Sequence, residues 1–279
     1  MVDPLWRGGE APPPWAAAGL AGWIRLLLRA PLLALVVFGG LGLLLVCRLV
    51  ERPLCGLHRP VTPWITVGVC RAALVILGIR YRVEGQPMTG RGALVANHAS
   101  WLDIFALNAP APLYFVAKSE VAGWPGIGWL ARATGTLFIR RDRREAQAQT
   151  LLFEARLRAG HRLCFFPEGT STDGLRVLPF KPTLFAAFFA HGLGEILQVQ
   201  PVTLIWLAPA GQDPRFFGWW GDMGFASHLL QVLAHGGGGA VRVVFHAPVA
   251  VTDVSGRKDL ARRLETEVRN GLRGARQGF

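Results

Sequence analysis

The sequence predicts an α/β protein with a mixed central sheet flanked by helices and an apolar helical hairpin at the N-terminus as a membrane anchor. Beyond residue 85, short apolar runs alternate with longer amphipathic segments, as strands and helices do in α/β domains. Before that point lie two long apolar stretches. Of the 279 residues, 51% are hydrophobic and 17% charged, which excludes a disordered, collagenous or coiled-coil protein.

The first apolar stretch, residues 30–47, contains no charged side chain. As a helix it would span about 27 Å, just short of a hydrocarbon core of about 30 Å. Arginines flank both ends, so the positive-inside rule assigns no direction, and no small-x-small site follows to indicate a cleaved signal peptide. A basic connector leads to the second stretch, residues 64–79. We predict a hairpin that dips into one leaflet, with a spanning helix as the alternative.

Composition divides the chain into three parts. Residues 1–22, rich in proline, glycine and alanine, are expected to be a mobile N-terminus. Residues 23–82 are the expected membrane-anchoring helices. Residues 83–279 are expected to form the main domain, of a size typical of a single α/β unit.

Short apolar runs within that domain predict six strands, at residues 93–96, 113–117, 136–139, 163–166, 199–207 and 241–245. Helical patterns occupy the segments between and after them, at residues 143–159, 184–190 and 258–273. The last segment places Leu260, Leu264, Val268 and Leu272 on one stripe, which predicts its buried face. Residues 210–224, with two adjacent tryptophans, are expected to form a loop that packs in the core or touches lipid.

The chain is strongly basic, with 30 Lys and Arg against 18 Asp and Glu and a net charge of +12. Such an excess favours an anionic partner, either nucleic acid or the acidic surface of a membrane. The high hydrophobicity favours the membrane, and no nucleic-acid-binding motif accompanies the charge, so we expect no nucleic-acid partner. The four cysteines form no CxxC pair, and no histidines lie at ligand spacing, so we expect no metal site.

The first segment that carries chemistry is residues 94–103, where an apolar strand ends at Asn97 and His98. Positions five apart on a continuous helix differ by about 140°, so His98 must lie on the turn before a helix to meet Asp103. A histidine bonded to a carboxylate is held in one tautomer, and its other nitrogen can take a proton from a hydroxyl. The alternative is a helix cap in which Asp103 answers Ser100 and His98 fills a turn.

The second such segment, residues 163–173, runs from an apolar strand into a turn. Gly169 permits close backbone approach there, so amide groups can converge on an anion or a carbonyl oxygen. Glu168 is unusual at the end of so apolar a strand; the alternative to a functional role is a buried carboxylate that closes the turn through backbone amides. The absence of a Gly-x-Ser-x-Gly sequence disfavours a serine-nucleophile hydrolase.

Four segments resemble, in the same order, the blocks of the glycerolipid acyltransferase family that includes the 1-acylglycerol-3-phosphate acyltransferases. Residues 97–103 (NHASWLD) resemble the first block, residues 135–141 (GTLFIRR) the second and residues 166–170 (FPEGT) the third. Residues 199–202 (VQPV) are similar to the Val-Pro-Val block that follows. The shared order makes the match specific.

The resemblance implies acyl transfer without a covalent enzyme intermediate, and it implies no metal or bound cofactor. His98 would deprotonate the free hydroxyl of a lysolipid, and Asp103 would orient the imidazole and stabilise its charge. The hydroxyl would then attack the thioester of an acyl-carrier protein or of coenzyme A. Because a thiolate is a good leaving group, positioning and one base suffice for this reaction.

The same resemblance assigns the residues that bind substrate. Lys118 and Arg141 would hold the anionic head group of the acceptor; the alternative is that they are surface charges at strand ends. Glu168, Gly169 and Thr170 would shape the acceptor pocket.

One departure from the family pattern concerns the acceptor. Members that act on phosphate-bearing acceptors usually have arginine after Glu-Gly-Thr, whereas Ser171 occupies that place here. Loss of a guanidinium removes a bidentate phosphate clamp. Either Arg140, Arg176 or Lys181 replaces it, or the acceptor lacks that phosphate.

The first expectation is therefore a membrane-bound 1-acylglycerol-3-phosphate O-acyltransferase that makes phosphatidic acid. The alternatives are the same chemistry on lyso-ornithine lipid and a non-catalytic, basic lipid-binding membrane protein. We expect the protein at the cell inner membrane, with the catalytic domain on the cytoplasmic face, where a soluble donor and an anionic membrane surface meet.

Overall fold

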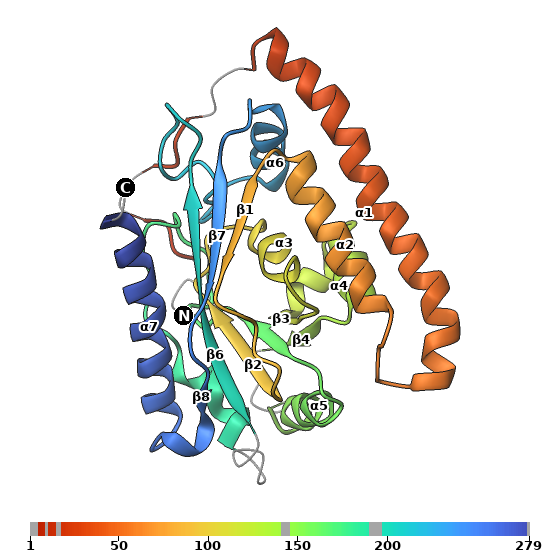
Figure 1. The fold of residues 1–279 in the computed structure, drawn as a ribbon, viewed down its shortest axis with the longest axis vertical. Coiled ribbons are helices and arrows are strands. Elements are labelled where there is room, and N and C mark those ends of the chain that lie inside the picture. The colour runs from red at the N-terminus through yellow and green to blue at the C-terminus, as the bar shows by residue number, and fades with distance from the viewer. Residues whose placement is uncertain (1–4, 9–10, 15–17, 141–145, 190–196, 278–279) are drawn as a thin grey trace.

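The computed structural model describes residues 5–8, 11–14, 18–140, 146–189 and 197–277. Its centre is an eight-stranded sheet of order β1-β7-β6-β2-β5-β3-β4, with β8 paired to β6 (Figure 1). The pairs β6–β7 and β6–β8 are antiparallel and the others are parallel, so the expected mixed sheet is confirmed. The strands are β1 (Arg80–Glu84), β2 (Gly92–Ala96), β3 (Tyr114–Lys118), β4 (Leu137–Ile139), β5 (Leu163–Phe165), β6 (Gln198–Leu207), β7 (Ala240–Phe245) and β8 (Val249–Ala250).

All six predicted strands are present, and β1 and β8 are the two that the sequence pattern did not indicate. Strand β1 has the sequence RYRVE, with three charged residues in five, because it lies at the edge of the sheet and is largely exposed. Strand β2 is buried along its whole length, with Leu94 and Ala96 in one core and Ala93 and Val95 in the other. Burial on both faces explains its continuous apolar run.

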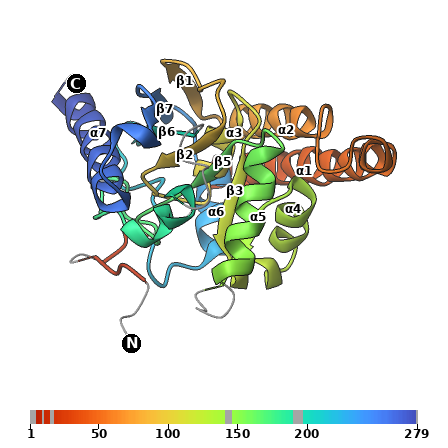
Figure 2. The same cartoon turned by 90° about the horizontal axis from the view of Figure 1, so that it is seen from below.

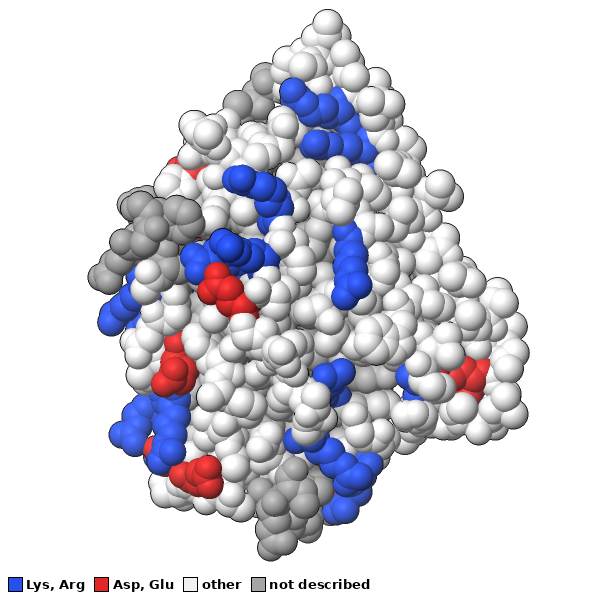
Figure 3. Space-filling view, viewed as in Figure 1, with Lys and Arg blue, Asp and Glu red and all other residues white. Residues whose placement is uncertain are grey.

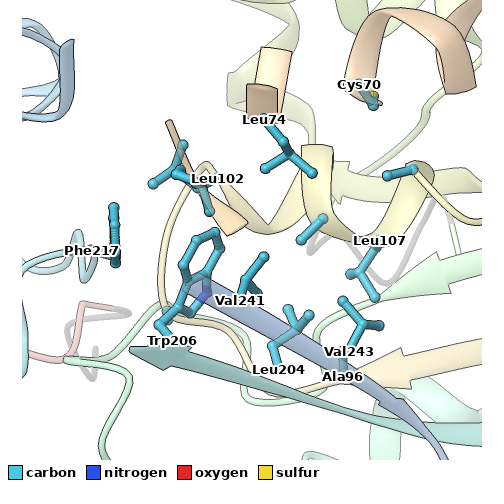
Figure 4. Packing of buried hydrophobic residues seen from close by; sticks show 14 of the residues in the cluster. Cys70, Leu74, Ala96, Leu102, Leu107, Leu204, Trp206, Phe217, Val241 and Val243 are labelled. Carbon is cyan, nitrogen blue, oxygen red and sulfur yellow. The ribbon is translucent and has the colours of Figure 1, made fainter. Parts of the chain in front are cut away.

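Helices cover both faces of the sheet, and each layer has its own core. One core packs α2, α3 and α6 on the sheet; in Figure 4, Leu74 of α2 and Leu107 of α3 lie over Leu204 and Val243 of the strands. The other core packs α5 and α7 on the sheet. In Figure 1, α7 lies on the side of the molecule away from the hairpin, and α5 lies below the hairpin. The helices are α2 (Thr62–Ile76), α3 (Asp103–Asn108), α4 (Ile127–Thr134), α5 (Ala146–Arg158), α6 (Phe225–Ala234) and α7 (Arg257–Gln277), with 3₁₀ segments η1 (Ser119–Gly123), η3 (Pro182–Phe189) and η5 (Val251–Asp253).

The predicted helical segments are found with two refinements. The predicted helix 143–159 is α5, and its residues 143–145 lie outside the described residues. The predicted helix 184–190 falls in the 3₁₀ helix η3, and its Ala190 lies outside the described residues. The stripe of α7 that carries Leu260, Leu264, Val268 and Leu272 is buried, as predicted. Residues 210–224 contain no helix or strand, and Trp220 among them packs in the interior.

The N-terminal hairpin consists of α1 (Leu20–Cys55) and α2, which run side by side on one flank of the molecule (Figures 1 and 2). Helix α1 has 36 residues and is the one described helix that is long and apolar enough to cross a membrane. Most of its apolar side chains are exposed, and the hairpin flank is largely free of charge, whereas Lys and Arg are spread over the rest of the view (Figure 3).

Candidate active site

The loop that carries the predicted catalytic residues, His98 and Asp103, begins where β2 ends. Asn97 continues the sheet with its side chain instead of its backbone: its amide donates to the Leu204 carbonyl over 2.9 Å, and its side-chain oxygen accepts from the Leu204 N–H over 2.8 Å. The backbone is thereby released to turn, and His98 lies on that turn. Asp103 follows as the first residue of α3, in the arrangement that the spacing requires.

His98 and Asp103 meet, with 2.8 Å between Nδ1 of the imidazole and Oδ2 of the carboxylate. The Asp103 side chain is completely buried, and the same Oδ2 accepts the backbone N–H groups of Ala99 and Ser100. The pairing with His98 and the cap of the Ser100 turn, which the sequence presented as alternatives, therefore exist together. One carboxylate both shapes the loop and orients the ring.

Trp206 fixes the second oxygen of that carboxylate. Its indole N–H donates to Asp103 Oδ1 over 2.7 Å from the interior of β6. Trp206 is 103 residues away from Asp103 in the sequence, so no local pattern indicated this contact.

The His98 ring is oriented on its face as well as at Nδ1. It stacks on Phe166, with ring centroids 3.9 Å apart and an interplanar angle of 11°. The side chain is 21% exposed, so the ring borders solvent while Asp103 does not. With the Nδ1 proton donated to Asp103, Nε2 keeps a lone pair that can accept a proton.

Glu168 supports the same loop from behind. Its Oε1 accepts the His98 N–H and its Oε2 accepts the Leu178 N–H, each over 2.7 Å. This is the geometry of the buried carboxylate that closes a turn. Burial, together with the nearby negative charge of Asp103, raises the pKa of Glu168 to about 8, although the two hydrogen bonds act in the opposite direction.

The turn after Glu168 is crowded from two sides. Gly169 has φ +74°, a left-handed conformation that favours glycine; a Cβ atom there would also lie 2.6 Å from Lys181 Nζ, so the flexible end of that lysine would have to move. The Thr170 hydroxyl accepts the backbone N–H of Trp6 over 3.3 Å. Trp6, near the N-terminus, therefore reaches the turn that follows Glu168, a contact that the sequence did not indicate.

The two predicted head-group residues differ in what the structure describes. Lys118 is the last residue of β3, which is parallel to β5 and through it to β2, so it lies at the same carboxyl edge of the sheet as His98. Arg141 lies outside the described residues. In the described part of the chain, no three His, Cys, Asp or Glu side chains form a group that could hold a metal ion.

Comparison with known proteins agrees with this architecture. The model of the family described as Acyltransferase matches residues 79–208, which span β1 to the end of β6. The chain is 61% identical over 272 residues to a lyso-ornithine lipid O-acyltransferase of Rhodobacter capsulatus, covering 98% of each chain. It is 40% identical over 129 residues to a 1-acyl-sn-glycerol-3-phosphate acyltransferase of Neisseria gonorrhoeae, covering 45% of this chain and 51% of the other.

A solved structure shares the fold. The 1-acyl-sn-glycerophosphate (LPA) acyltransferase of Thermotoga maritima superposes with a TM-score of 0.64 and 24% identity, over 91% of this chain and 98% of that one. A shared fold alone carries no function, but the end-to-end match to the Rhodobacter protein does establish kinship. The chain belongs to the acyltransferase family.

Proposed function

We propose that the protein is a membrane-bound O-acyltransferase that moves a fatty acyl group from a thioester donor to the free hydroxyl of lyso-ornithine lipid. The observation that carries the chemistry is the pairing of His98 Nδ1 with the buried Asp103 carboxylate over 2.8 Å. A non-catalytic lipid-binding protein would have no need of a buried carboxylate that fixes the orientation of a partly exposed imidazole.

The choice of acceptor has separate support. The relative that aligns over 98% of the chain carries the name lyso-ornithine lipid O-acyltransferase, whereas the Neisseria glycerophosphate enzyme aligns over 45%. Ser171 also removes the guanidinium expected of a phosphate clamp. The second candidate acceptor is 1-acylglycerol-3-phosphate, favoured by the four sequence blocks that resemble its acyltransferases.

The proposed reaction needs one base and good positioning. His98 Nε2 takes the proton of the acceptor hydroxyl while the oxygen attacks the carbonyl carbon of the thioester, which forms the new C–O bond. The tetrahedral intermediate collapses, the C–S bond breaks and the thiolate leaves. The imidazolium then gives its proton to the sulfur, which restores neutral His98. Asp103 stabilises the imidazolium between the two steps.

The remaining site residues have supporting roles in this proposal. Glu168 holds the backbone of His98 at its working position, and Gly169 lets Lys181 approach the turn. Lys118 and Thr170 border the acceptor, and Arg141, assigned from the family resemblance alone, binds its head group. The donor is acyl-carrier protein or acyl-CoA, since both present the same thioester.

The hairpin indicates where in the cell the proposed reaction takes place. Helix α2, at 15 residues, would span about 22 Å, less than a hydrocarbon core of about 30 Å, and its Ala73 and Leu74 pack into the domain. We therefore propose a shallow anchor in one leaflet of the inner membrane, on the cytoplasmic side; the alternative is that α1, which is long and apolar enough to cross a membrane, spans it. The lipid acceptor would then reach His98 from the membrane and the donor from water.

The test is mass analysis of the products that purified protein makes from a panel of lysolipids with acyl-carrier protein and CoA donors. Wild type is expected to acylate lyso-ornithine lipid in preference to lysophosphatidic acid. His98→Ala should lower kcat by about 10²- to 10⁴-fold, the usual contribution of a general base. His58→Ala, which changes an exposed histidine in the hairpin loop, should leave kcat unchanged. Undiminished transfer by His98→Ala would contradict the assigned base.

A further inference from the structure

An arginine–aspartate pair stands next to the catalytic loop. Asp173 is buried, and its two oxygens accept Arg176 Nε over 3.2 and 3.1 Å and Arg176 Nη2 over 2.8 Å. The Leu175 N–H donates to the same carboxylate. The Arg176 side chain is 54% exposed. A buried, fixed carboxylate therefore holds an exposed guanidinium in one orientation.

The backbone of this pair is joined to that of His98. The buried Thr172 donates its backbone N–H to the His98 carbonyl over 2.9 Å. Its hydroxyl lies 3.2 Å from the same carbonyl oxygen and 3.4 Å from the carbonyl oxygen of Arg176. The His98 and Arg176 loops are thus in direct contact at one edge of the sheet.

Trp6 packs against the guanidinium from another side. The Arg176 guanidinium carbon lies 5.1 Å from the centre of the Trp6 ring, a cation–π contact. Trp6 is itself held by two contacts. Its backbone N–H donates to the Thr170 hydroxyl, and its ring packs on that of Trp220, with the centroids 6.1 Å apart. Asp173 occupies one edge of the guanidinium and Trp6 one face. The Nη1 group makes no hydrogen bond within the described part of the chain.

The charge of the pair selects the kind of anion it suits. Asp173 neutralises Arg176, and Ser171 takes the place of a second guanidinium, so the Arg176–Asp173 pair by itself carries no net positive charge to match a phosphate dianion. A carboxylate carries one charge and matches the planar fork of arginine. In the acceptor of the proposed function, one amide and its flanking carbons separate the amino-acid carboxylate from the reacting hydroxyl. In the protein, Thr172 joins the backbones of His98 and Arg176.

We infer that Arg176 binds the carboxylate of the acceptor's amino-acid head group and so determines acceptor specificity, with Asp173 and Trp6 as its positioning residues. This inference rests on the proposed function for the identity of the acceptor. It assigns the discrimination between amino-acid and phosphate head groups to a residue outside the four family blocks.

The test compares two acceptors on the same enzyme, lyso-ornithine lipid and its ornithine methyl ester, in which the carboxylate is uncharged. Removing one partner of a charged hydrogen bond costs about 10- to 100-fold in affinity. Wild type should therefore lose about 10- to 100-fold in kcat/KM on the ester, largely through KM. Arg176→Gln should lose a similar factor on the acid and show little further loss on the ester.

Two controls separate recognition from stability. Arg262→Gln breaks an Asp–Arg pair of the same i,i+3 spacing on α7, with 2.7 Å between Arg262 and Asp259. This variant should leave kcat/KM unchanged on both acceptors. The double variant Asp173→Asn with Arg176→Gln removes the buried charge that the single variant leaves unpaired. It should behave as Arg176→Gln does in the comparison of acid and ester.

The outcomes distinguish the inference from the proposed function. If wild type acylates neither the acid nor the ester, the acceptor assignment fails. If wild type acylates the acid, but Arg176→Gln still discriminates acid from ester as strongly as wild type does, Arg176 is not the ligand of the carboxylate.

Discussion

Trp206 illustrates how a residue without chemistry of its own can determine the geometry of the site. Its indole N–H is the donor for Asp103 Oδ1, in the interior, where a lost donor is not replaced by water. Trp206→Phe should lower the free energy of unfolding by about 1–3 kcal/mol and reduce kcat about tenfold, because the His98 ring loses part of its fixed support. Thermal unfolding and steady-state kinetics measure the two effects.

The chain provides a matched control for this substitution. Trp220 is also buried, and its indole nitrogen has no hydrogen-bond partner among the described residues. Trp220→Phe removes the same atoms without removing a hydrogen bond, so it should destabilise the protein less and leave kcat closer to wild type. Equal losses of stability and of kcat in the two variants would show that the lost side-chain volume, and not the lost hydrogen bond to Asp103, causes the effect.

Glu168 gives the protein a pH dependence of known sign. Its pKa of about 8 in the folded protein exceeds the ordinary value of about 4.5 that applies in the unfolded chain. Between these two values the folded protein holds a proton that the unfolded chain has released, so the contribution of Glu168 to stability declines as pH rises through this window. The difference in melting temperature between wild type and Glu168→Gln should shrink as pH increases from about 5 to 8. A difference that grows with pH would mean that the carboxylate is the favoured form.

The sequence identified the residues whose partners are near in the chain. His98 and Asp103 are five positions apart, and one turn before a short helix brings them together. Glu168 meets the His98 backbone across 70 residues, and Trp206 meets Asp103 across 103. Such contacts depend on which strands are neighbours, and no periodicity within a segment contains that information.

The two helices of the hairpin pack closely at one glycine of α1. A Cβ atom on Gly40 would lie 2.3 Å from Val69 Cγ2 of α2, whereas one on Gly42 would meet nothing within 4 Å. Val69 is β-branched and stiff in a helix, so it cannot turn away cheaply. Gly40→Ala should lower the melting temperature, and Gly42→Ala should keep or raise it, since alanine favours a helix by up to about 1 kcal/mol.

Differential scanning calorimetry of the two variants in the same detergent checks this prediction. Because both changes add one methyl group to the same helix, differences in helix propensity cancel between them. If Gly42→Ala is as destabilising as Gly40→Ala, the contact between α1 and α2 does not limit the packing.

Elements were predictable where burial is one-sided or complete over several residues. The stripe of α7 and the apolar run of β2 are examples, because each reflects the environment of that segment alone. Strand β1 was missed since an edge strand keeps charged side chains, and α4 was missed because a helix of eight residues spans barely two turns. In those cases neighbouring elements, and not local pattern, decide the conformation.

The exposed apolar side chains of the hairpin predict how the entire protein partitions. Leu35 of α1 and Leu151 of α5 are both exposed leucines, but only Leu35 belongs to the hairpin. Leu35→Lys should weaken binding to lipid vesicles about tenfold or more, because a charge in the apolar region costs a few kcal/mol. Leu151→Lys should have little effect. Co-sedimentation with vesicles measures both variants. Equal weakening of vesicle binding by the two substitutions would contradict membrane binding through the hairpin.

The architecture as a whole was predictable to the level of a mixed sheet with an apolar hairpin. The order of strands was not, because β6 pairs in parallel with β2 and antiparallel with β7, and either direction is compatible with a fully buried strand. The net charge of +12 indicated an anionic partner but not which arginines contact it. Arg25 and Arg29, for example, donate to carbonyls at the end of α6 and join the hairpin to the domain.

The pairing of β1 with β7 has a consequence for biosynthesis. The hairpin is complete once α2 has left the ribosome, but β1 receives its partner only when β7 emerges about 170 residues later. At typical rates of translation this interval lasts about 10 to 30 s. Throughout it, the nascent chain carries a finished apolar hairpin and an unfinished sheet. The enzyme would therefore be tethered to its membrane before it can fold into an active catalyst.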